Sequence, residues 1–132
     1  MFFDTHNHSQ FSFDGEGTTV EKSAMAAAGK GFGGICFTDH CDFYVPKMKE
    51  EFEPIVSEVF DVESQQAEID RVNGLIASGS LGRIFPKKFK IFKGIELGLG
   101  EKNHEQTRKL LANKSFDQII ASVHYLEDTD PY

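Results

Sequence analysis

Short apolar stretches alternate along the chain with longer segments in which apolar residues follow a helical spacing. An apolar run of about four to eight residues predicts a buried strand, and apolar positions three and four residues apart predict a helix with one buried face. The predicted strands are residues 2–5, 33–37, 89–95 and 116–123. The predicted helices are residues 20 to about 28, 60–77 and 103 to about 112.

Residues at the ends of the predicted helices support these boundaries. Thr18 and Glu21 have the form of a capping box, in which a hydroxyl and a carboxylate three residues apart satisfy free N–H groups at a helix start. Asn103 suits the N-cap of the third helix. Glycines, which commonly end helices, follow the first two. They are Gly29, Gly31, Gly79 and Gly82.

The order of the elements predicts an α/β fold. Strands that alternate with helices pair in parallel and are joined by right-handed crossovers. A closed βα barrel needs more strands and typically runs to about 250 residues, whereas this chain has 132. We therefore expect four parallel strands with intervening helices, the amino-terminal half of a barrel, in a single domain over residues 1–132 that is truncated at its carboxyl end. Residues 41–54 are predicted to be a loop.

Metal-ligand residues stand at the carboxyl ends of all four predicted strands. These ends meet at one edge of a parallel sheet, so we expect the side chains to converge there. His6 and His8 lie two residues apart, which on a strand points both imidazoles to one face. The other strands end at His40, Glu96 and His124. Each residue has an ordinary interpretation as a packed or surface residue, but the four strand ends together favour a metal site.

Other polar residues near these strand ends are less specific. Asp14 precedes a glycine and on its own indicates only a turn. Asp42 can either support a ligand or face a substrate. Cys41 follows His40 and is expected to pack rather than to bind metal, and Cys36 is expected to be a small buried hydrophobe. His104 begins a helix away from any strand end and is interpreted as a surface residue.

Composition excludes several functional classes. The net charge of −7 argues against a general binder of nucleic acid or anionic membranes. No apolar stretch approaches the ~20 residues of a membrane span, and the amino terminus lacks the pattern of a secretory signal. Two cysteines form no disulfide framework, which fits a reducing cytoplasm. The glycines of residues 29–34 follow a helix and precede a strand, the wrong order for a phosphate-binding loop.

Five motifs together resemble the PHP (polymerase and histidinol phosphatase) family, specifically its histidinol-phosphate phosphatase branch. The resemblance covers nearly the whole chain, in the family's order, and implies the amino-terminal half of the domain. It implies a distorted seven-stranded TIM-like βα barrel with up to three divalent ions at the carboxyl ends of the strands. The motifs are residues 4–9, 11–15, 38–40, 94–98 and 122–125.

The resemblance also implies a role for each strand-end residue. His6 and His8 resemble ligands of a first ion, and His124 resembles a ligand of a second. Glu96 resembles the carboxylate that bridges these two ions, and with His6 and His8 it is expected to act in catalysis through the bound metals. Two to three ions are expected, with zinc, manganese or iron suited to such ligands. The full set of expected ligands is His6, His8, Asp14, His40, Glu96 and His124, with Asp14 and His40 on a third ion.

The implied activity is that of a phosphoric monoester hydrolase of histidine biosynthesis. It converts L-histidinol phosphate and water to L-histidinol and phosphate, so the expected partner is a small-molecule phosphate monoester rather than nucleic acid or membrane. Further ligands and the basic residues that bind the substrate phosphate are expected beyond Tyr132. We therefore expect the 132 residues alone to be weakly active or inactive, and the open half-barrel to be prone to self-association.

Three alternatives stay open. The chain could be another PHP-family phosphoesterase, such as a phosphodiesterase or a polymerase-associated nuclease. It could be a metal-dependent amidohydrolase, a class that also begins with two histidines after its first strand and cleaves C–N bonds. It could also be a non-catalytic half-barrel that binds metal. The motif at residues 38–40 and the strand-end Glu96 favour the phosphoesterase.

Overall fold

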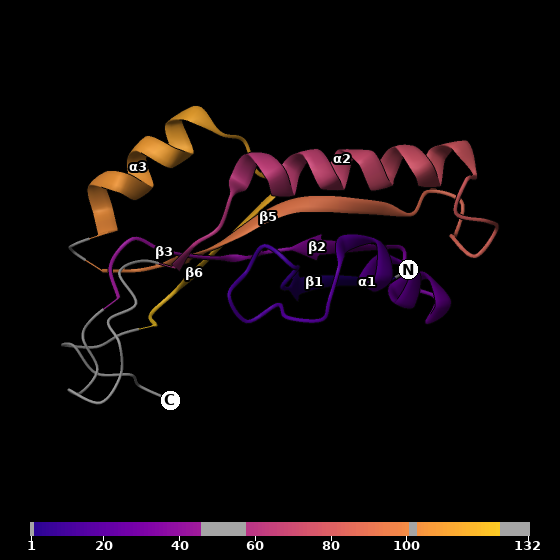
Figure 1. Cartoon of the computed structure of the whole chain (residues 1–132), viewed down its shortest axis with the longest axis horizontal. Coiled ribbons are helices and arrows are strands. Elements are labelled where there is room, and N and C mark those ends of the chain that lie inside the picture. Colours follow the sequence, from indigo (N-terminus) through magenta and orange to yellow (C-terminus); the bar gives the residue numbers. More distant parts are fainter. Residues whose placement is uncertain (1, 46–57, 101–102, 125–132) are drawn as a thin grey trace.

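A computed structural model describes residues 2–45, 58–100 and 103–124, which form a largely parallel sheet with helices packed against it (Figure 1). Its helices are α1 (Val20–Gly29), α2 (Val62–Ser78) and α3 (His104–Asn113). Its strands are β1 (Phe3–Asn7), β2 (Gly34–Phe37), β3 (His40–Asp42), β4 (Glu58–Val59), β5 (Lys90–Gly98) and β6 (Gln118–Ser122). No helix among these described ranges is both long and apolar enough to cross a membrane.

Four parallel strands, β1, β2, β5 and β6, follow one another across the sheet in chain order. β1 pairs with β2, β2 with the first part of β5, and β5 with β6, all in parallel. β3 pairs in parallel with the later part of β5, on the edge that β2 also uses, with His40 opposite Glu96. β2 and β3 are thus two parts of one interrupted strand. The expected parallel α/β order is confirmed, with carboxyl ends at one edge.

The structure corrects the prediction of a loop over residues 41–54. β3 already includes Cys41 and Asp42, and β4 pairs with it in antiparallel orientation. The sequence hides β3 because His-Cys-Asp lacks the apolar run of a strand, and its pairing with β5 is what makes it extended. Residues 46–54 of the predicted loop lie outside the described residues.

α1 and α2 cover the same face of the sheet. Val20 and Ala24 from α1 and Ile69 and Val72 from α2 share one buried cluster with strand residues such as Ile91. α2 runs along the length of β5 (Figure 1). Burying such side chains stabilises the fold by about 1.5–3 kcal/mol each for the larger ones, so this core is what fixes the strands that carry the site.

The helix caps differ in detail from the predicted ones. The N-cap of α1 is Thr19, one residue later than predicted, because the Thr19 hydroxyl accepts the N–H of Lys22, whereas the Thr18 hydroxyl donates to the carbonyl of Gly15. Asn103 is the N-cap of α3 as predicted, but its side chain donates to the carbonyl of Gly98 and does not cap the helix. Asn103 therefore ties α3 to the end of β5.

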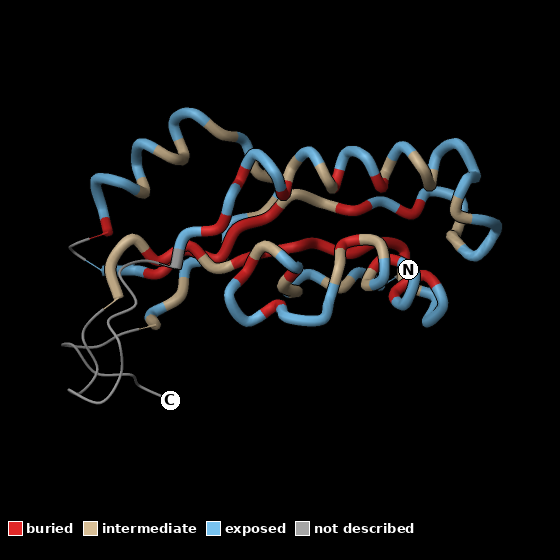
Figure 2. Tube along the Cα trace, viewed as in Figure 1, coloured by how far each residue is buried: buried red, intermediate tan, exposed pale blue. Residues whose placement is uncertain are grey.

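Burial falls off toward the last strand. Figure 2 shows buried residues along β2 and β5, whereas α3 contains no buried residue. Ile119 of β6 is 49% exposed and Phe3 of β1 is 46% exposed, so both outer strands present apolar side chains to solvent. Of the candidate ligands, Glu96 on β5 is buried, whereas the side chain of His6 on β1 is half-exposed.

Candidate metal centre

Glu96 lies at the centre of the strand-end residues. Its side chain is 6% exposed. Its Oε2 atom lies 3.0 Å from the Nε2 atoms of both His6 and His8, and its Oε1 atom lies 3.1 Å from Nε2 of His124. The hydroxyl of Ser122 donates to the same Oε1 at 2.7 Å. The two carboxylate oxygens therefore face different histidines.

Three overlapping groups of ligand atoms form around this carboxylate. Within each group, one nitrogen or oxygen atom per residue lies within 4.8 Å of the others, which is compact enough for the group to hold a metal ion. All six residues that the sequence identified are brought together here. The groups are His6, His8 and Glu96; His8, Asp14 and His40; and His40, Glu96 and His124.

The expected grouping differs from the observed one at His40. The resemblance places His40 with Asp14, and the structure places it in that group and also beside Glu96 and His124. The register explains this, because His40 is the residue of β3 that pairs with Glu96 of β5. His40 is thus shared between two groups, and its assignment to one ion stays a prediction.

A tight turn carries Asp14 back toward the strand ends. The carbonyl of Ser9 accepts the N–H of Ser12, and the carbonyl of Ser12 accepts the N–H of Gly15. A Cβ atom at Gly15 would lie 1.7 Å from the Ser9 carbonyl oxygen, so only glycine fits. The turn places Oδ2 of Asp14 2.7 Å from Nδ1 of His8.

The hydrogen bonds in this turn keep Asp14 ionised. Burial raises the pKa of the Asp14 carboxyl, but hydrogen bonds from Ser12 and His8 outweigh it and hold the pKa below its usual value. Burial likewise raises the pKa of Glu96, and bonds from Ser122, His124 and His6 lower it to about 2. Both carboxylates are therefore negatively charged at neutral pH, as metal ligands must be.

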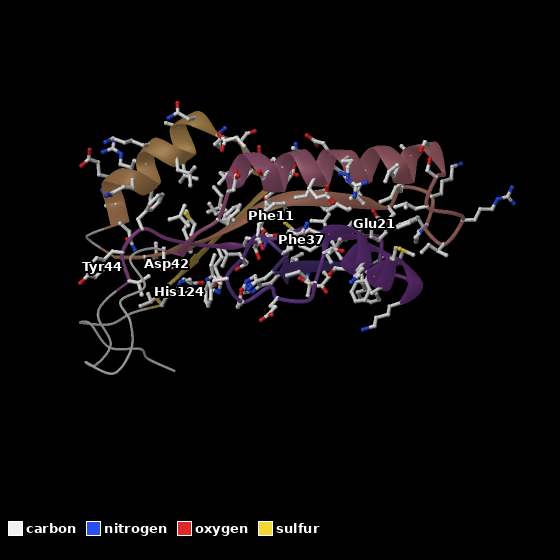
Figure 3. The ribbon with its side chains drawn as sticks, viewed as in Figure 1. Phe11, Glu21, Phe37, Asp42, Tyr44 and His124 are labelled. Carbon is white, nitrogen blue, oxygen red and sulfur yellow. The ribbon has the colours of Figure 1, made fainter. Side chains whose placement is uncertain are left out.

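Asp42 orients His124. Figure 3 labels both residues, which come from β3 and from the chain just after β6. The Asp42 side chain is 1% exposed, and its Oδ2 atom lies 2.7 Å from Nδ1 of His124. A buried carboxylate that binds one imidazole nitrogen fixes the orientation of the ring and leaves the other nitrogen to coordinate a metal ion. Nε2 of His124 is the nitrogen that faces Glu96.

Asp42 also sets the charge of His124 in the absence of metal. Its hydrogen bond, assisted by Glu96 and opposed by burial, raises the pKa of His124 to about 9. Because the folded pKa exceeds the ordinary value of 6.5, the stabilisation is fully present below about pH 6.5 and is lost as the pH rises through about 9. The metal-free protein therefore loses stability over this window.

We expect Asp42→Asn to bring the titration of His124 back toward its ordinary range in the metal-free protein, because the substitution removes the partner charge. NMR titration of the histidine ring protons, with a chelator present, measures this. Asp70→Asn, an exposed carboxylate on α2 that pairs with Lys93, is the control and should leave His124 unchanged. Titration of His124 near pH 6.5 in the unsubstituted protein would contradict the account.

The histidine and carboxylate side chains of the three groups are suited to bind a divalent cation. Imidazole with carboxylate is a combination that zinc and related ions prefer. Nδ1 of His40 is buried without a hydrogen-bond partner, and the nearest carboxylate oxygens, from Asp42 and Glu96, lie 3.8 Å away. Burial also lowers the pKa of His40, which favours the neutral ring that binds metal.

The remaining sequence candidates lie away from these groups. His104 is exposed at the start of α3, as expected. Cys36 and Cys41 are buried free thiols, and burial raises the pKa of each to about 12, so neither supplies a thiolate at neutral pH. Sequence reasoning gave no role to Ser122, although this residue begins the motif of residues 122–125.

The chain matches a known protein family. The PHP domain matches residues 4–132. A protein of Clostridium acetobutylicum named "probable histidinol-phosphatase" is 30% identical over 132 residues, which is 100% of this chain and 43% of that protein. The histidinol-phosphatase of Lactococcus lactis subsp. lactis is 33% identical over 129 residues, covering 98% of this chain and 41% of that protein.

A solved structure supports the same match. The crystal structure of the histidinol phosphate phosphatase from Lactococcus lactis, complexed with zinc, L-histidinol and phosphate, superposes with a TM-score of 0.74 at 30% identity. The match covers 99% of this chain and 43% of that one. The expected fold, an α/β portion of a TIM-like barrel, is confirmed by this likeness. The chain spans less than half the length of the relatives that it matches.

Proposed function

Because this chain belongs to the PHP domain family, we propose that its strand-end residues bind two to three divalent ions in a phosphomonoesterase site whose substrate is L-histidinol phosphate. The arrangement of histidines around Glu96 is the main support for this proposal. Two of the three donor groups share Glu96, and each of its carboxylate oxygens faces different histidines. A carboxylate placed in this way can bridge two ions.

These contacts support a proposed role for each ligand. We assign His6, His8 and Glu96 to one ion and His124 with Glu96 to a second, with Asp14 and His40 on a third. Zinc is the first candidate, because the Lactococcus relative was crystallised with it, and manganese and iron suit the same donors. His6, the most exposed ligand with 52% of its side chain accessible, lies at the open side of the site.

Bound divalent ions in such a site lower the pKa of a water molecule and offset the negative charge of a phosphoryl group. The chain's own residues set the geometry. Asp42 holds His124, Ser122 holds one oxygen of Glu96, and the hydroxyl of Ser12 holds Asp14. These contacts fix the ligands before a substrate binds, which is how preorganised sites stabilise a transition state.

L-Histidinol phosphate is proposed because the two curated relatives are named histidinol-phosphatase and probable histidinol-phosphatase, and the related structure contains L-histidinol and phosphate. The proposed reaction is hydrolysis to L-histidinol and phosphate, as a step of histidine biosynthesis. The proposed activity belongs to a complete barrel, and we expect little turnover from the 132 residues alone. Cytoplasmic location, self-association and a single domain over residues 1–132 stay predictions.

A graft tests the proposed function. We expect a chimera in which this chain replaces the matching segment of the Lactococcus enzyme to release phosphate from L-histidinol phosphate. The same chimera with Glu96→Gln should be slower by at least about 100-fold, because it lacks the bridging ligand. Phosphate release is measured for both chimeras at the same zinc concentration, and the ratio of the two rates tests the role of Glu96.

Two outcomes of this assay would count against the proposal. One is turnover of a cyclic amide but not of L-histidinol phosphate, which would favour the amidohydrolase alternative. The other is a folded, zinc-loaded chimera that releases no phosphate while the parent enzyme does so under the same conditions.

A further inference from the structure

Asp39 is a buried carboxylate that belongs to none of the three donor groups. Its residue is 0% exposed. Its Oδ1 atom accepts the backbone N–H of Ser9 at 2.5 Å, and its Oδ2 atom accepts the Ser9 hydroxyl at 2.7 Å. A buried charge without such donors would cost several kcal/mol, so these bonds hold Ser9 and Asp39 together.

These bonds connect the segments that carry the candidate ligands. Ser9 directly follows His8 and begins the turn that carries Asp14. Asp39 directly precedes His40, and its backbone carbonyl accepts the N–H of Glu96 at 3.1 Å. A shift of the Asp39 carboxylate would therefore move ligands of all three groups relative to one another.

One further donor to Asp39 comes from outside the strand-end segments. Nε2 of Gln65, in the first turns of α2, donates to Oδ2 of Asp39 at 2.7 Å. Gln65 is 0% exposed, and its amide also lies 3.4 Å from the carbonyl of Gly94. Its Oε1 atom is buried without a partner. A half-satisfied buried amide costs stability, so the contribution of Gln65 lies in the bonds that its Nε2 atom donates, of which the bond to Asp39 is the shorter.

We propose that Gln65 is a positioning residue for the metal centre, which acts from α2 by fixing Asp39. The Asp39 carboxylate holds Ser9, between His8 and the turn of Asp14, and the Asp39 backbone joins His40 and Glu96. The inference rests on the proposed function only in that the site binds metal, and not on the substrate. Gln65 touches no ligand atom, so its effect reaches the ions through Asp39 and, by a longer bond, through the carbonyl of Gly94 on β5.

Gln65→Met tests this role with little change in shape. Methionine has nearly the same length and removes both the donor to Asp39 and the unpaired Oε1, so the loss and the gain in stability offset each other. We expect the melting temperature to stay near that of the unsubstituted chain. We also expect binding of Co²⁺, used as a spectroscopic probe, to weaken about tenfold, as loss of outer-shell partners typically does, with an altered visible absorption spectrum.

Gln66→Met is the matched control on the same helix. Gln66 donates to the carbonyl of Ser115, away from the site, so its replacement should leave Co²⁺ affinity and the spectrum unchanged. Unchanged affinity and spectrum in Gln65→Met would overturn the proposal. Equal weakening in both variants would also overturn it, because the cause would then be a general loosening of α2.

Gln65→Asn keeps the test decisive if the methionine variant does not fold. Asparagine retains a buried amide, but its side chain is one methylene shorter, so the amide no longer reaches Oδ2 of Asp39. The same weakening of Co²⁺ binding is expected. Normal Co²⁺ binding in a folded Gln65→Asn variant would overturn the proposal. Failure of the chimera to hydrolyse L-histidinol phosphate would leave it intact, because Co²⁺ binding is measured without substrate.

Discussion

Glu96→Gln should abolish tight zinc binding by two of the three donor groups, which is the largest effect that we expect from a single substitution. Among the residues that the structure describes, only Glu96 has two carboxylate oxygens that each face a different histidine. Losing only an outer-shell partner weakens metal binding by about 10- to 100-fold, so losing this ligand should cost at least about 100-fold. Isothermal titration with Zn²⁺ measures the affinity and the number of ions bound.

Glu105→Gln is the control for this experiment. It makes the same change of charge on α3, where the Glu105 side chain is 77% exposed and pairs with Lys109. Zinc affinity and stoichiometry should match those of the unsubstituted chain. If Glu96→Gln and Glu105→Gln bind zinc alike, Glu96 is not a ligand and the proposed site is wrong.

Gly98→Ala is expected to have the second-largest effect, because it lowers both the stability of the fold and the affinity of the site for zinc. A Cβ atom at Gly98 would lie 1.7 Å from Oδ1 of Asp42, which is 0% exposed and cannot move into solvent. Crowding of this kind typically costs about 1–3 kcal/mol. Displacing Asp42 also releases His124, so the free energy of unfolding and the affinity for zinc should both fall.

Gly100→Ala is a matched control two residues along the chain. The nearest heavy atom to a Cβ there is 3.7 Å away, an ordinary contact. Denaturant unfolding and zinc titration of the two variants separate crowding at Asp42 from the general effect of replacing glycine. Wild-type stability and zinc affinity in Gly98→Ala would show that the Asp42 contact does not constrain the site.

Much of the fold is predictable because apolar runs and helix ends leave local signals. β1, β2, β5 and β6 all coincide with predicted strands to within a few residues, and α2 coincides with the predicted long helix. β3 was missed because its strand conformation comes from pairing with β5, a contact between residues far apart in sequence. The residue types of β3 do not by themselves predict such a contact.

The candidate ligands were predictable for a similar reason. A histidine or carboxylate at the end of a strand is visible in the sequence, and the parallel sheet brings such ends together, as it does for Glu96 and His124. Among the residues that position the ligands, the sequence indicated Asp42 but not Gln65 or Ser122. Gln65 and Ser122 are ordinary polar residues until the fold places them beside Asp39 and Glu96.

Anomalous X-ray scattering from zinc-loaded crystals shows whether ions bind at the strand ends around Glu96. We predict peaks about 2.0–2.2 Å from the ligand atoms, one shared by His6, His8 and Glu96 and another beside His124 on the opposite oxygen of Glu96. Peaks only at other residues, such as the exposed His104, or none within coordinating distance of Glu96, would contradict the account.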